Sequence, residues 1–546
     1  MRILFEISLI IISTILPLAV AEPIKCGTQQ ALQNYFAKGK SQQVPDLPFS
    51  YGTEHFKLWY DTTGNDAVYP ADTDDNEIPD YIEQAGIYLE QVWNIVVDSL
   101  GYRRPLPDTL WLPDTADYGG DARTDVYFVN MGRGLYGETQ PRANHFDGIS
   151  NKATAYIEIQ SDMTRLENYA DNPFPPLKVT CAHEFFHTVQ FAYHCPSDAE
   201  YSNFIWWMEA TAVFNEEFCY DDINDYYLYL GEFQDNPQVP LFIKDPGITT
   251  EYGGVMFPIF LEEFYSSDTV RFTGLLIKRI WEICESETPV DAVDDALAEI
   301  GSSLMNAYAD FTYWRIRTED QWQSGYFSEG ANYPLPKMDS VQIENAFTDD
   351  FNIRPLATKY FILPYTYDEN GVIASLTSST QYISSQLEVM RIEISQSSPL
   401  GGFDLVELGD TFGIAGRWQY RAIAYAPLLY SAPLSADFSI WLDTEDTSIV
   451  PVNKQNEVYH PFPNPCDNGV VKFPIDIISP ADVAVHIFTP SGENIWNFGE
   501  EISLPDYLEI EWNCTNSSGS NVSPGIYIAQ IDVGTKTKFF KLFISR

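Results

Sequence analysis

The chain is poor in basic residues and in cysteine, and beyond its N-terminus it has no long apolar run. Its 31 Lys and Arg residues face 78 Asp and Glu residues, which gives a formal net charge of −47. A surface this acidic repels phosphate backbones and anionic lipid headgroups, which argues against nucleic-acid and membrane-surface binding. Seven cysteines without CxxC spacing argue against a disulfide scaffold and a thiolate zinc site. The preferred disulfides are the local pairs Cys195–Cys219 and Cys466–Cys514.

The N-terminus is typical of a secretory signal peptide. Arg2 supplies a positive charge, an apolar stretch runs from Ile7 to Val20, and Ala19-Val20-Ala21 fits the small-x-small cleavage rule. The mature chain is therefore expected to start at Glu22 and to be secreted or held at the cell surface, with no membrane span after processing. A membrane anchor is the alternative, but the apolar core is shorter than the roughly 20 residues that span a bilayer.

The length and composition indicate several globular domains. The 546 residues are 45% hydrophobic and 15% aromatic, enough for about three to four domains. Helical periodicity is found only in the first part, at Tyr81–Leu100, Leu177–Tyr193, Asn203–Phe218, Phe257–Tyr265, Val270–Cys284 and Leu304–Arg317. The domains expected after the signal peptide (1–21) are a mixed α+β domain at 22–345, an all-β sandwich at 346–450 and a second β-rich domain at 456–546.

The sharpest pattern is an HExxH motif, His183-Glu184-Phe185-Phe186-His187, inside an apolar helix-like run. Four residues of helix turn about 400°, so His183 and His187 lie on one face and can bind the same metal ion. Glu184, next to the first imidazole, can act as a general base toward a water molecule at that metal. The alternative is a chance pair of core histidines, which the strongly apolar context of the motif disfavours.

The third ligand decides the class of zinc site. His194 is one candidate, but on a continuing helix it lies about 10 Å along the axis from His187, too far to share an ion. Glu209 is the other, because a lone carboxylate in the apolar run Phe204–Phe214 costs several kcal/mol unless it is paired or metal-bound. Two histidines and one glutamate leave a fourth position open for water, as in catalytic zinc sites. The remaining acidic residues of this region are expected to be solvated or to support the ligands from behind: Asp198, Glu200, Glu216 and Glu217.

Two further segments are candidates for the substrate cleft. Thr154–Ile159 has the pattern of a strand, and in zinc peptidases of this type an edge strand commonly pairs with an extended peptide. Tyr252, beside Gly253 and Gly254, has a hydroxyl that can donate to a developing oxyanion. An ordinary aromatic residue at a helix start is the equally supported alternative for Tyr252.

An acidic stretch at 72–83 has the spacing of a calcium loop of the EF type, with a helix expected after it. Position 6 of the loop is Glu77, where glycine is usual because the turn needs a permissive backbone. An acidic surface turn is the alternative interpretation. The expected ligands of a structural calcium ion are Asp72, Asp74, Asn76, Ile78 through its carbonyl, Asp80 and Glu83.

These motifs together resemble a family of secreted bacterial metalloproteases, zincins that use a glutamate as the third ligand (gluzincins). The resemblance covers about Phe56 to Arg317. It implies that His183, His187 and Glu209 bind zinc and that Glu184 is the base. In that family the acidic loop more often reads DxDxNGIPD, from which Glu77 departs. The motifs that carry it are the Asp72–Tyr81 loop, HEFFHTVQFAY, WWMEATA with the acidic stretch Tyr220–Tyr227, and YGGVMFPIFL.

The C-terminal part resembles a sorting domain of the type IX secretion system, type A. Such a domain is an Ig-like β-sandwich that directs passage across the outer membrane, so the resemblance implies contact with the type IX machinery. A generic β-sandwich or a carbohydrate-binding module is the alternative. The matching segments are Tyr459–Pro465, Ala484–Gly492, Ser523–Ile528 and Lys541–Ile544, and Val483, Val485 and Ile487 alternate as in a half-buried strand.

The sequence thus predicts a multidomain fold: an α+β zincin-like metalloprotease domain, an all-β sandwich domain and a C-terminal Ig-like β-sandwich sorting domain. The predicted function is a secreted zinc-dependent endopeptidase acting on a peptide or protein substrate, with zinc as catalytic and calcium as structural ion. One alternative is a surface adhesin or binding protein on a zincin scaffold that has lost catalysis. Another is a secreted glycan-binding protein, which the aromatic content alone suggests.

Overall fold

The structure is a computed structural model of the chain. It describes residues 25–38, 44–107, 119–132, 134–142, 151–243, 248, 250–265, 271–322 and 324–340. From 341 to 455 it describes the backbone of the strands given below and residues 355–356, and from 456 to 544 all residues except 459–460, 462–465, 467–468, 478–479 and 503–505. The predicted signal peptide lies outside the described residues.

The first part of the chain is an α/β region built on a five-stranded sheet with the order β1-β2-β3-β5-β4. The central pairs β2–β3 and β3–β5 are parallel, whereas β1 and β4 are antiparallel to their neighbours. The strand that the sequence placed at the edge is β5, which lies inside the sheet, and β4 takes the edge instead. The strands are β1 (Phe49–Gly52), β2 (Phe56–Tyr60), β3 (Thr124–Val129), β4 (Gly137–Pro141) and β5 (Ala155–Gln160).

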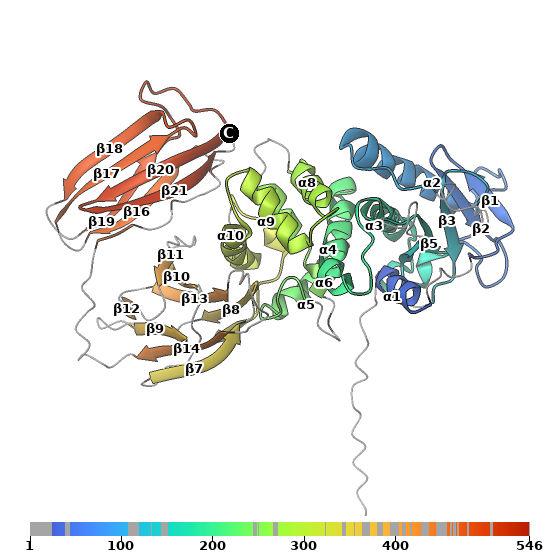
Figure 1. The fold of residues 1–546 in the computed structure, drawn as a ribbon, viewed down its shortest axis with the longest axis horizontal. Helices are drawn as coiled ribbons and strands as arrows, with labels where there is room; N and C mark the ends of the chain where they lie inside the picture. The colour runs from blue at the N-terminus through green and yellow to red at the C-terminus, as the bar shows by residue number, and fades with distance from the viewer. Residues whose placement is uncertain are drawn as a thin grey trace, which may run out of the picture.

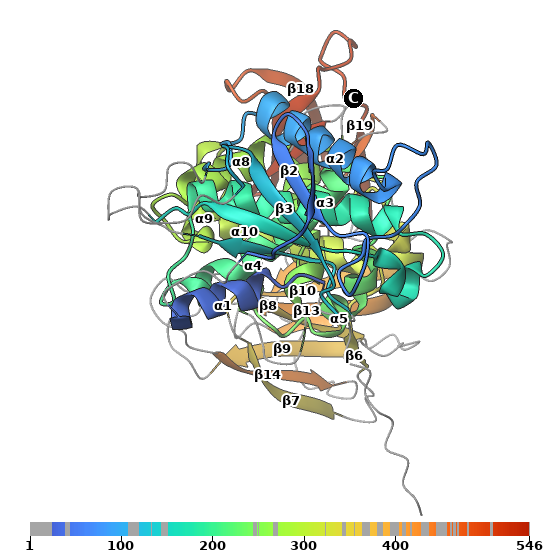
Figure 2. The same cartoon turned by 90° about the vertical axis from the view of Figure 1, so that its right-hand side faces the viewer.

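Helices α2 (Asp80–Trp93) and α3 (Phe174–Tyr193) pack on this sheet and on each other, and α1 (Thr28–Lys38) lies beside β4 (Figures 1 and 2). A π-helical turn, Asn94–Ser99, continues α2. Two prolines occupy the first turn of α3, where their missing N–H groups cost no helix hydrogen bond. Beyond that turn α3 is buried on almost every side, which explains its nearly continuous apolar sequence.

A set of further helices packs on the other side of α3 (Figure 1). Helix α4 (Tyr201–Cys219) lies directly against α3 and is itself buried over most of its length. One apolar core joins these helices to the sheet. The other elements of this layer are α5 (Tyr227–Asp235), α6 (Thr250–Gly253), α7 (Met256–Tyr265), α8 (Leu275–Ile283), α9 (Pro289–Glu299), α10 (Leu304–Ile316) and 3-10 turns at Met163–Arg165, Glu167–Tyr169, Glu319–Gln321 and Gly330–Asn332.

Two β-sheets follow the α/β region. One has the strand order β11-β10-β13-β8-β6 and the other β12-β9-β14-β7, and every pair is antiparallel except β6–β8. Their strands are β6 (Met338–Ser340), β7 (Ala346–Ile353), β8 (Ala357–Ile362), β9 (Val372–Ser378), β10 (Gln386–Glu393), β11 (Phe403–Val406), β12 (Thr411–Ile414), β13 (Trp418–Ala426) and β14 (Ala436–Asp443).

The C-terminal part holds two more antiparallel sheets, β15-β16-β19 and β18-β17-β20-β21, around a core of their own (Figure 1). Val483, Val485 and Ile487 on β17 all point into that core, as their alternation predicted. The chain is therefore multidomain, with an α/β region followed by β-sheet domains. These last strands are β15 (Glu457–Val458), β16 (Val471–Ile477), β17 (Ala481–Phe488), β18 (Asn494–Ile502), β19 (Asp506–Trp512), β20 (Gly525–Val533) and β21 (Lys536–Ile544).

Among the described residues, no helix combines the length and the apolar character needed to cross a bilayer. The thiols Cys466 and Cys514 lie with their Sγ atoms 3.7 Å apart in the C-terminal core. Cys195 and Cys219 are free thiols, so the disulfide predicted between them is not formed in this structure.

Candidate metal centre

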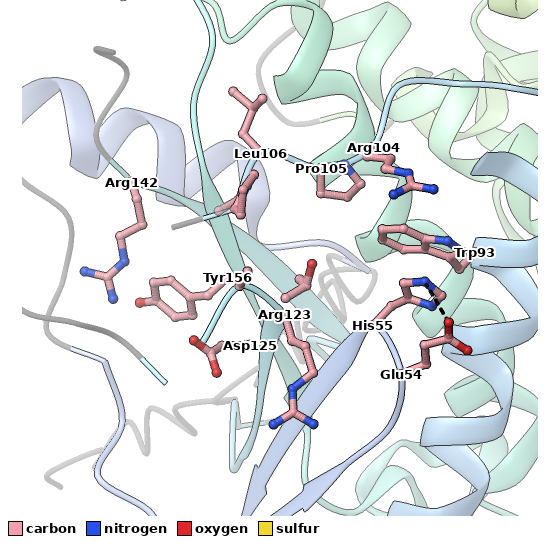
Figure 3. A pocket seen from close by; sticks show the side chains of 14 residues that line it. Glu54, His55, Trp93, Arg104, Pro105, Leu106, Arg123, Asp125, Arg142 and Tyr156 are labelled. Carbon is pink, nitrogen blue, oxygen red and sulfur yellow. Dashed lines mark ion pairs between the residues drawn. The ribbon is translucent and has the colours of Figure 1, made fainter. Parts of the chain in front are cut away.

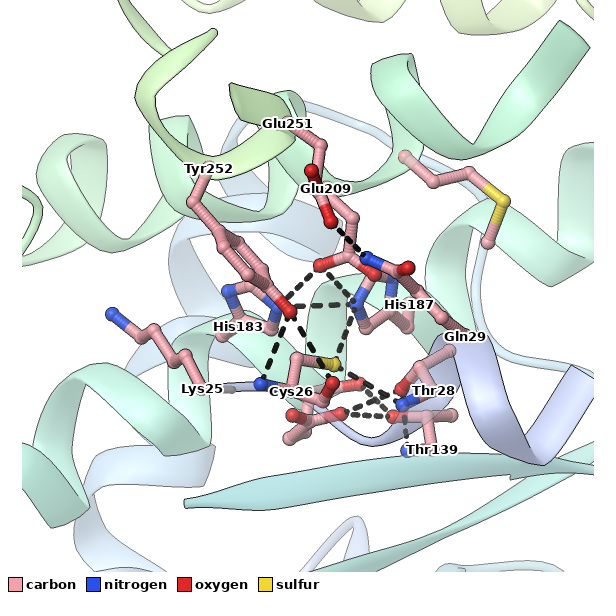
Figure 4. A network of polar contacts seen from close by, with 12 residues as sticks. Lys25, Cys26, Thr28, Gln29, Thr139, His183, His187, Glu209, Glu251 and Tyr252 are labelled. Carbon is pink, nitrogen blue, oxygen red and sulfur yellow. Dashed lines mark hydrogen bonds and ion pairs between the residues drawn. The ribbon is translucent and has the colours of Figure 1, made fainter. Parts of the chain in front are cut away.

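Helices α3 and α4 bring the three predicted zinc ligands together (Figure 4). His183 Nε2 and His187 Nε2 lie 3.1 Å apart on one face of α3. Oε2 of Glu209, from the middle of α4, is 3.3 Å from His183 Nε2 and 3.8 Å from His187 Nε2. All three side chains are fully buried. The structure thus assembles the set that the sequence proposed, from two helices that pack side by side.

The donor set fits a zinc ion. Bonds of the usual length in a tetrahedral site separate two ligand nitrogens by about 3.3 Å, close to the separations seen here. Among the residues that the structure describes, none donates a hydrogen bond to either carboxylate oxygen of Glu209, and Oε2 lies beside the two imidazole nitrogens. A buried carboxylate without a donor is costly, and a cation between it and the imidazoles removes that cost.

A second layer of side chains fixes both imidazoles. His183 Nδ1 contacts Glu216 Oε1 at 2.6 Å, and His187 Nδ1 contacts Gln190 Oε1 at 2.8 Å. The Gln190 amide in turn donates to the carbonyl of Met208 on α4. Such partners set the tautomer and orientation of metal-binding histidines. Glu216 is therefore a buried support, and Gln190 is a functional candidate that sequence reasoning missed.

The rival third ligands lie elsewhere. The His194 ring stacks on Phe204 with centroids 4.2 Å apart, and its Nδ1 contacts Asn151. Glu200 bonds to Ser197, and Glu217 pairs with Arg271. His194 lies just after α3 in an extended conformation, so its side chain leaves the face that carries the HExxH pair.

Glu184 lies on the sheet side of the cluster and is buried. Its Oε2 accepts hydrogen bonds from Thr139 Oγ1 on β4, at 2.8 Å, and from Thr28 Oγ1, at 3.2 Å. Burial raises the pKa of Glu184 to about 7. Gly137 allows this close approach, since a Cβ there would lie 2.7 Å from Glu184 Cγ. The base that the sequence predicted is thus held against the edge strand of the sheet.

A fourth candidate ligand, Cys26, lies at the cluster and was missed from the sequence. Its Sγ is 3.5 Å from His187 Nε2, and one donor atom from each of Cys26, His183, His187 and Glu209 lies within 4.8 Å of the others. The sulfur of Cys26 therefore joins the three predicted ligands as a further candidate, whereas the sequence predicts an open position for water. Cysteines were weighed only as disulfides and CxxC pairs; the signal that could have found Cys26 is a lone cysteine next to the predicted start of the mature chain.

Tyr252, on α6, points at the same place (Figure 4). Its hydroxyl lies 3.3 Å from both the main-chain nitrogen and the carbonyl oxygen of Cys26. Its ring centroid is 6.5 Å from that of His183. The structure therefore brings Tyr252 to the cluster of candidate ligands, where its hydroxyl bonds to main-chain groups of Cys26.

The acidic loop before α2 also gathers its carboxylates. Asp72, Asp74 and Asp80 each place one oxygen within 4.8 Å of the others. The Asn76 amide contacts both Asp74, at 3.1 Å, and Glu83, at 3.0 Å. Ile78 donates its N–H to Asn76 Oδ1. The predicted calcium loop thus has its side-chain donors grouped together.

Glu77 in this loop has the backbone conformation that favours glycine, with a φ of 69°. Its N–H donates to Asp72 Oδ2 at 3.0 Å. Position 6 of the loop is therefore a non-glycine residue held in the left-handed backbone conformation, which is strained for it.

A separate cavity of about 320 Å³ lies beside the first residues of β3 and β5 and beside Trp93 of α2 (Figure 3). Arg142 and Tyr156 line it, with the guanidinium 4.3 Å from the ring centroid. On the neighbouring strands Glu138 and Glu158 stand directly opposite each other. Burial and the Glu138 carboxylate raise the pKa of Glu158 to about 7, against the smaller effect of Arg142. The predicted metal ligands, Glu184 and Tyr252 do not line this cavity, whereas Ala155 and Tyr156 of the predicted cleft strand do.

Comparisons with known proteins give no family. No protein-family model matches the chain, and no curated protein matches it. Among solved structures, a periplasmic lysozyme inhibitor of g-type lysozyme from Salmonella Typhimurium, PliG, matches 20% of this chain and 97% of its own, at 13% identity and a TM-score of 0.15.

Two matches are to proteins of Porphyromonas gingivalis. Dimeric latent PorU is 15% identical over 38% of this chain and 19% of its own, with a TM-score of 0.16. PorZ, a surface component of the type-IX secretion system, is 18% identical over 20% of this chain and 14% of its own, with a TM-score of 0.13. The chain spans less than a fifth of either protein, and likenesses this weak carry no argument about fold or function.

Proposed function

We propose that the chain is an exported zinc-dependent endopeptidase, with His183, His187 and Glu209 as ligands and Glu184 as general base. The observation that supports it most is the convergence of two imidazole nitrogens and one carboxylate without a hydrogen-bond donor, with a second carboxylate beside them. We propose a zincin-like α+β domain for the region that holds them, because the HExxH helix packs against a sheet whose edge strand reaches the base.

The proposed chemistry assigns a task to each of the site's own groups. Zinc, when bound, polarises a peptide carbonyl and a water molecule. Glu184, held by Thr139, accepts the proton of that water and passes it to the leaving nitrogen. Tyr252 donates to the carbonyl oxygen as that oxygen gains charge. Edge strand β4 offers main-chain groups to an extended peptide.

Metal analysis and hydrolysis test the proposal together. Purified chain should contain one equivalent of zinc by mass spectrometry, and His187→Ala should lose it. Because Cys26 covers the ligands, casein hydrolysis is best measured on a Cys26→Ala chain. Glu184→Gln in that background should keep zinc and abolish hydrolysis; retained hydrolysis would refute the assigned base.

A zincin scaffold without catalysis is the competing function, and one observation favours it: the ligands are fully buried beneath Cys26. The same experiment separates the two. Zinc binding with no hydrolysis of a broad peptide library by the Cys26→Ala chain would identify a binding protein instead of a peptidase.

For the rest of the chain we propose a structural calcium ion in the Asp72–Glu83 loop and an Ig-like sorting domain at 456–546. The grouped carboxylates support the first. The motifs of the tail, together with two antiparallel sheets around one core, support the second. A reporter fused to 456–546 should leave a bacterium that has a type IX system and stay inside a strain that lacks it.

A further inference from the structure

The segment just after the predicted signal peptide lies across the candidate metal centre and pairs with the start of β4 through a single bridge. The Lys25 carbonyl accepts from Tyr136 N–H at 2.9 Å, and Gly27 N–H donates to the Gly137 carbonyl at 2.8 Å. Cys26 thereby pairs in parallel with Gly137, at the start of edge strand β4. This edge is where an extended peptide would add to the sheet.

We propose that Cys26 is the fourth ligand of the metal centre and that the segment Lys25–Lys38 keeps the peptidase latent until it is displaced or removed. This inference rests on the proposed function. The Sγ atom lies 3.5 Å from His187 Nε2, and a nitrogen and a sulfur on one tetrahedral zinc ion are about 3.6 Å apart. The buried oxygens of Glu209, which accept no hydrogen bond from any described residue, are the second observation that indicates a cation there.

The segment also engages the other groups assigned to catalysis. Thr28 Oγ1 donates to Glu184, which occupies the carboxylate of the base. The Tyr252 hydroxyl bonds to the main chain of Cys26, at the place where it would meet a substrate carbonyl. Gln29 Nε2 bonds to Glu251 Oε1 at 2.9 Å, next to Tyr252. A substrate cannot reach these groups while the segment is in place, so the described state is closed.

The direct test of the ligand is spectroscopic and needs no activity. The full chain loaded with cobalt(II) should show a sulfur-to-cobalt charge-transfer band in the near ultraviolet, and X-ray absorption of the zinc form should show sulfur at about 2.3 Å. Cys26→Ser should lose both signals and keep one equivalent of metal. Cys284→Ser, which changes another buried cysteine outside the centre, should retain both. Zinc without a sulfur signal in the unchanged chain would overturn the assignment.

Hydrolysis then tests latency. If most molecules of the unchanged chain are closed, Cys26→Ala should raise casein hydrolysis about tenfold or more. The rate rises because a larger fraction of the molecules is open to substrate. Equal hydrolysis by both chains would overturn latency and leave the peptidase proposal standing. A sulfur signal with no hydrolysis by either chain would leave Cys26 as a ligand and overturn both latency and the peptidase proposal. Circular dichroism of each variant confirms that it is folded.

A second inference comes from the side chain of Lys25, which is fully buried. Its Nζ lies 2.5 Å from both Glu216 and Asp225, and it lies 5.7 Å and 5.5 Å from the ring centroids of Tyr136 and Tyr229. Two carboxylates and two aromatic faces form a pocket that fits an ammonium group. Lys25, whose side chain fills this pocket, directly precedes Cys26 in the sequence.

We infer that this pocket is a substrate subsite that takes a lysine side chain next to the scissile bond once the segment has left. Departure of Lys25 leaves Glu216 and Asp225 buried without their cation, and a substrate lysine restores it. The Lys25→Ala/Cys26→Ala chain should therefore cleave a peptide library preferentially beside lysine.

Asp225→Asn in the same chain changes the pocket without changing the metal site, because the side chain of Asp225 bonds to Lys25 and Tyr169 and not to a proposed ligand. It should raise KM for a lysine peptide about tenfold, with little change for the same peptide carrying methionine. Asp222→Asn, which changes an exposed neighbour, is the matched control. An unchanged lysine preference in Asp225→Asn, or no preference in the parent, would overturn the subsite.

Discussion

The contact between Glu216 and His183 predicts how strongly the site should hold its metal. Glu216 is 2% exposed and His183 is fully buried, and their Oε1–Nδ1 distance of 2.6 Å is that of a charge-assisted hydrogen bond. Loss of such an outer partner typically weakens metal affinity 10- to 100-fold, which is about 1.4 to 2.7 kcal/mol. We expect Glu216→Gln, which keeps an acceptor, to fall near the lower value and Glu216→Ala near the upper.

Competition with a chromophoric chelator measures the zinc affinity of each variant. Glu216 also pairs with Lys25, so part of any change in unfolding would come from that pair. Far-ultraviolet circular dichroism in the presence of chelator therefore checks the fold independently of the metal. Asp222→Asn, an exposed carboxylate change on the same side of the molecule, should leave affinity unaltered. A folded Glu216→Ala chain with the affinity of the unchanged protein would refute the reasoning.

Three further predictions concern other residues. Glu77→Gly should raise the free energy of unfolding by about 1 kcal/mol in urea titrations, because it relieves a φ of 69°; an unchanged midpoint would contradict this. In the Cys26→Ala chain, Gly137→Ala should lower kcat/KM about a hundredfold, because its Cβ meets the base; an unaffected rate would argue against that contact. The raised pKa of Glu158 means that the folded state binds the extra proton, so stability falls as pH rises from about 4.5 to 7. In Glu158→Gln, the loss of unfolding free energy between pH 4.5 and 8 should be about 1 to 2 kcal/mol smaller than in the unchanged chain. Urea titrations at the two pH values measure it, and the same midpoint shift in both chains would disprove the prediction.

Helices and the HExxH face could be predicted because they depend on short-range periodicity. The periodic run at 177–193 lies within α3, and the run at 203–218 lies within α4. The run at 270–284 was predicted too long, because Gly274 has a φ of 70° and α8 starts only after it. Glu209 could be chosen as a ligand because one carboxylate in an apolar helix needs a partner.

Features that depend on pairing between distant segments could not be predicted. The sequence predicts β5 at the edge of the sheet, but β4 lies there instead. The reason is that the short strand Gly137–Pro141 pairs antiparallel with β5 and covers it. Its sequence GETQP carries no alternating apolar signal. The contact of Cys26 with His187 joins residues 161 positions apart, and no local pattern encodes it. For Glu216 the sequence left a solvated position and a supporting position open, because its neighbours are polar, and the contact with His183 Nδ1 decides for support.

The charges around His183 connect the two inferences about the N-terminal segment. Glu184, Glu209 and Glu216 are three buried carboxylates around two imidazoles, an excess of negative charge that needs cations. Lys25 supplies one at Glu216, while its neighbour Cys26 lies at the ligand cluster on the other side of the His183 ring. Two consecutive residues therefore lie at the two ends of one line of contacts, which runs from Lys25 through Glu216, His183 and His187 to Cys26. Release of the segment removes one positive charge behind Glu216 and one thiolate at the ligands together, so the net charge around His183 changes little while a coordination position opens.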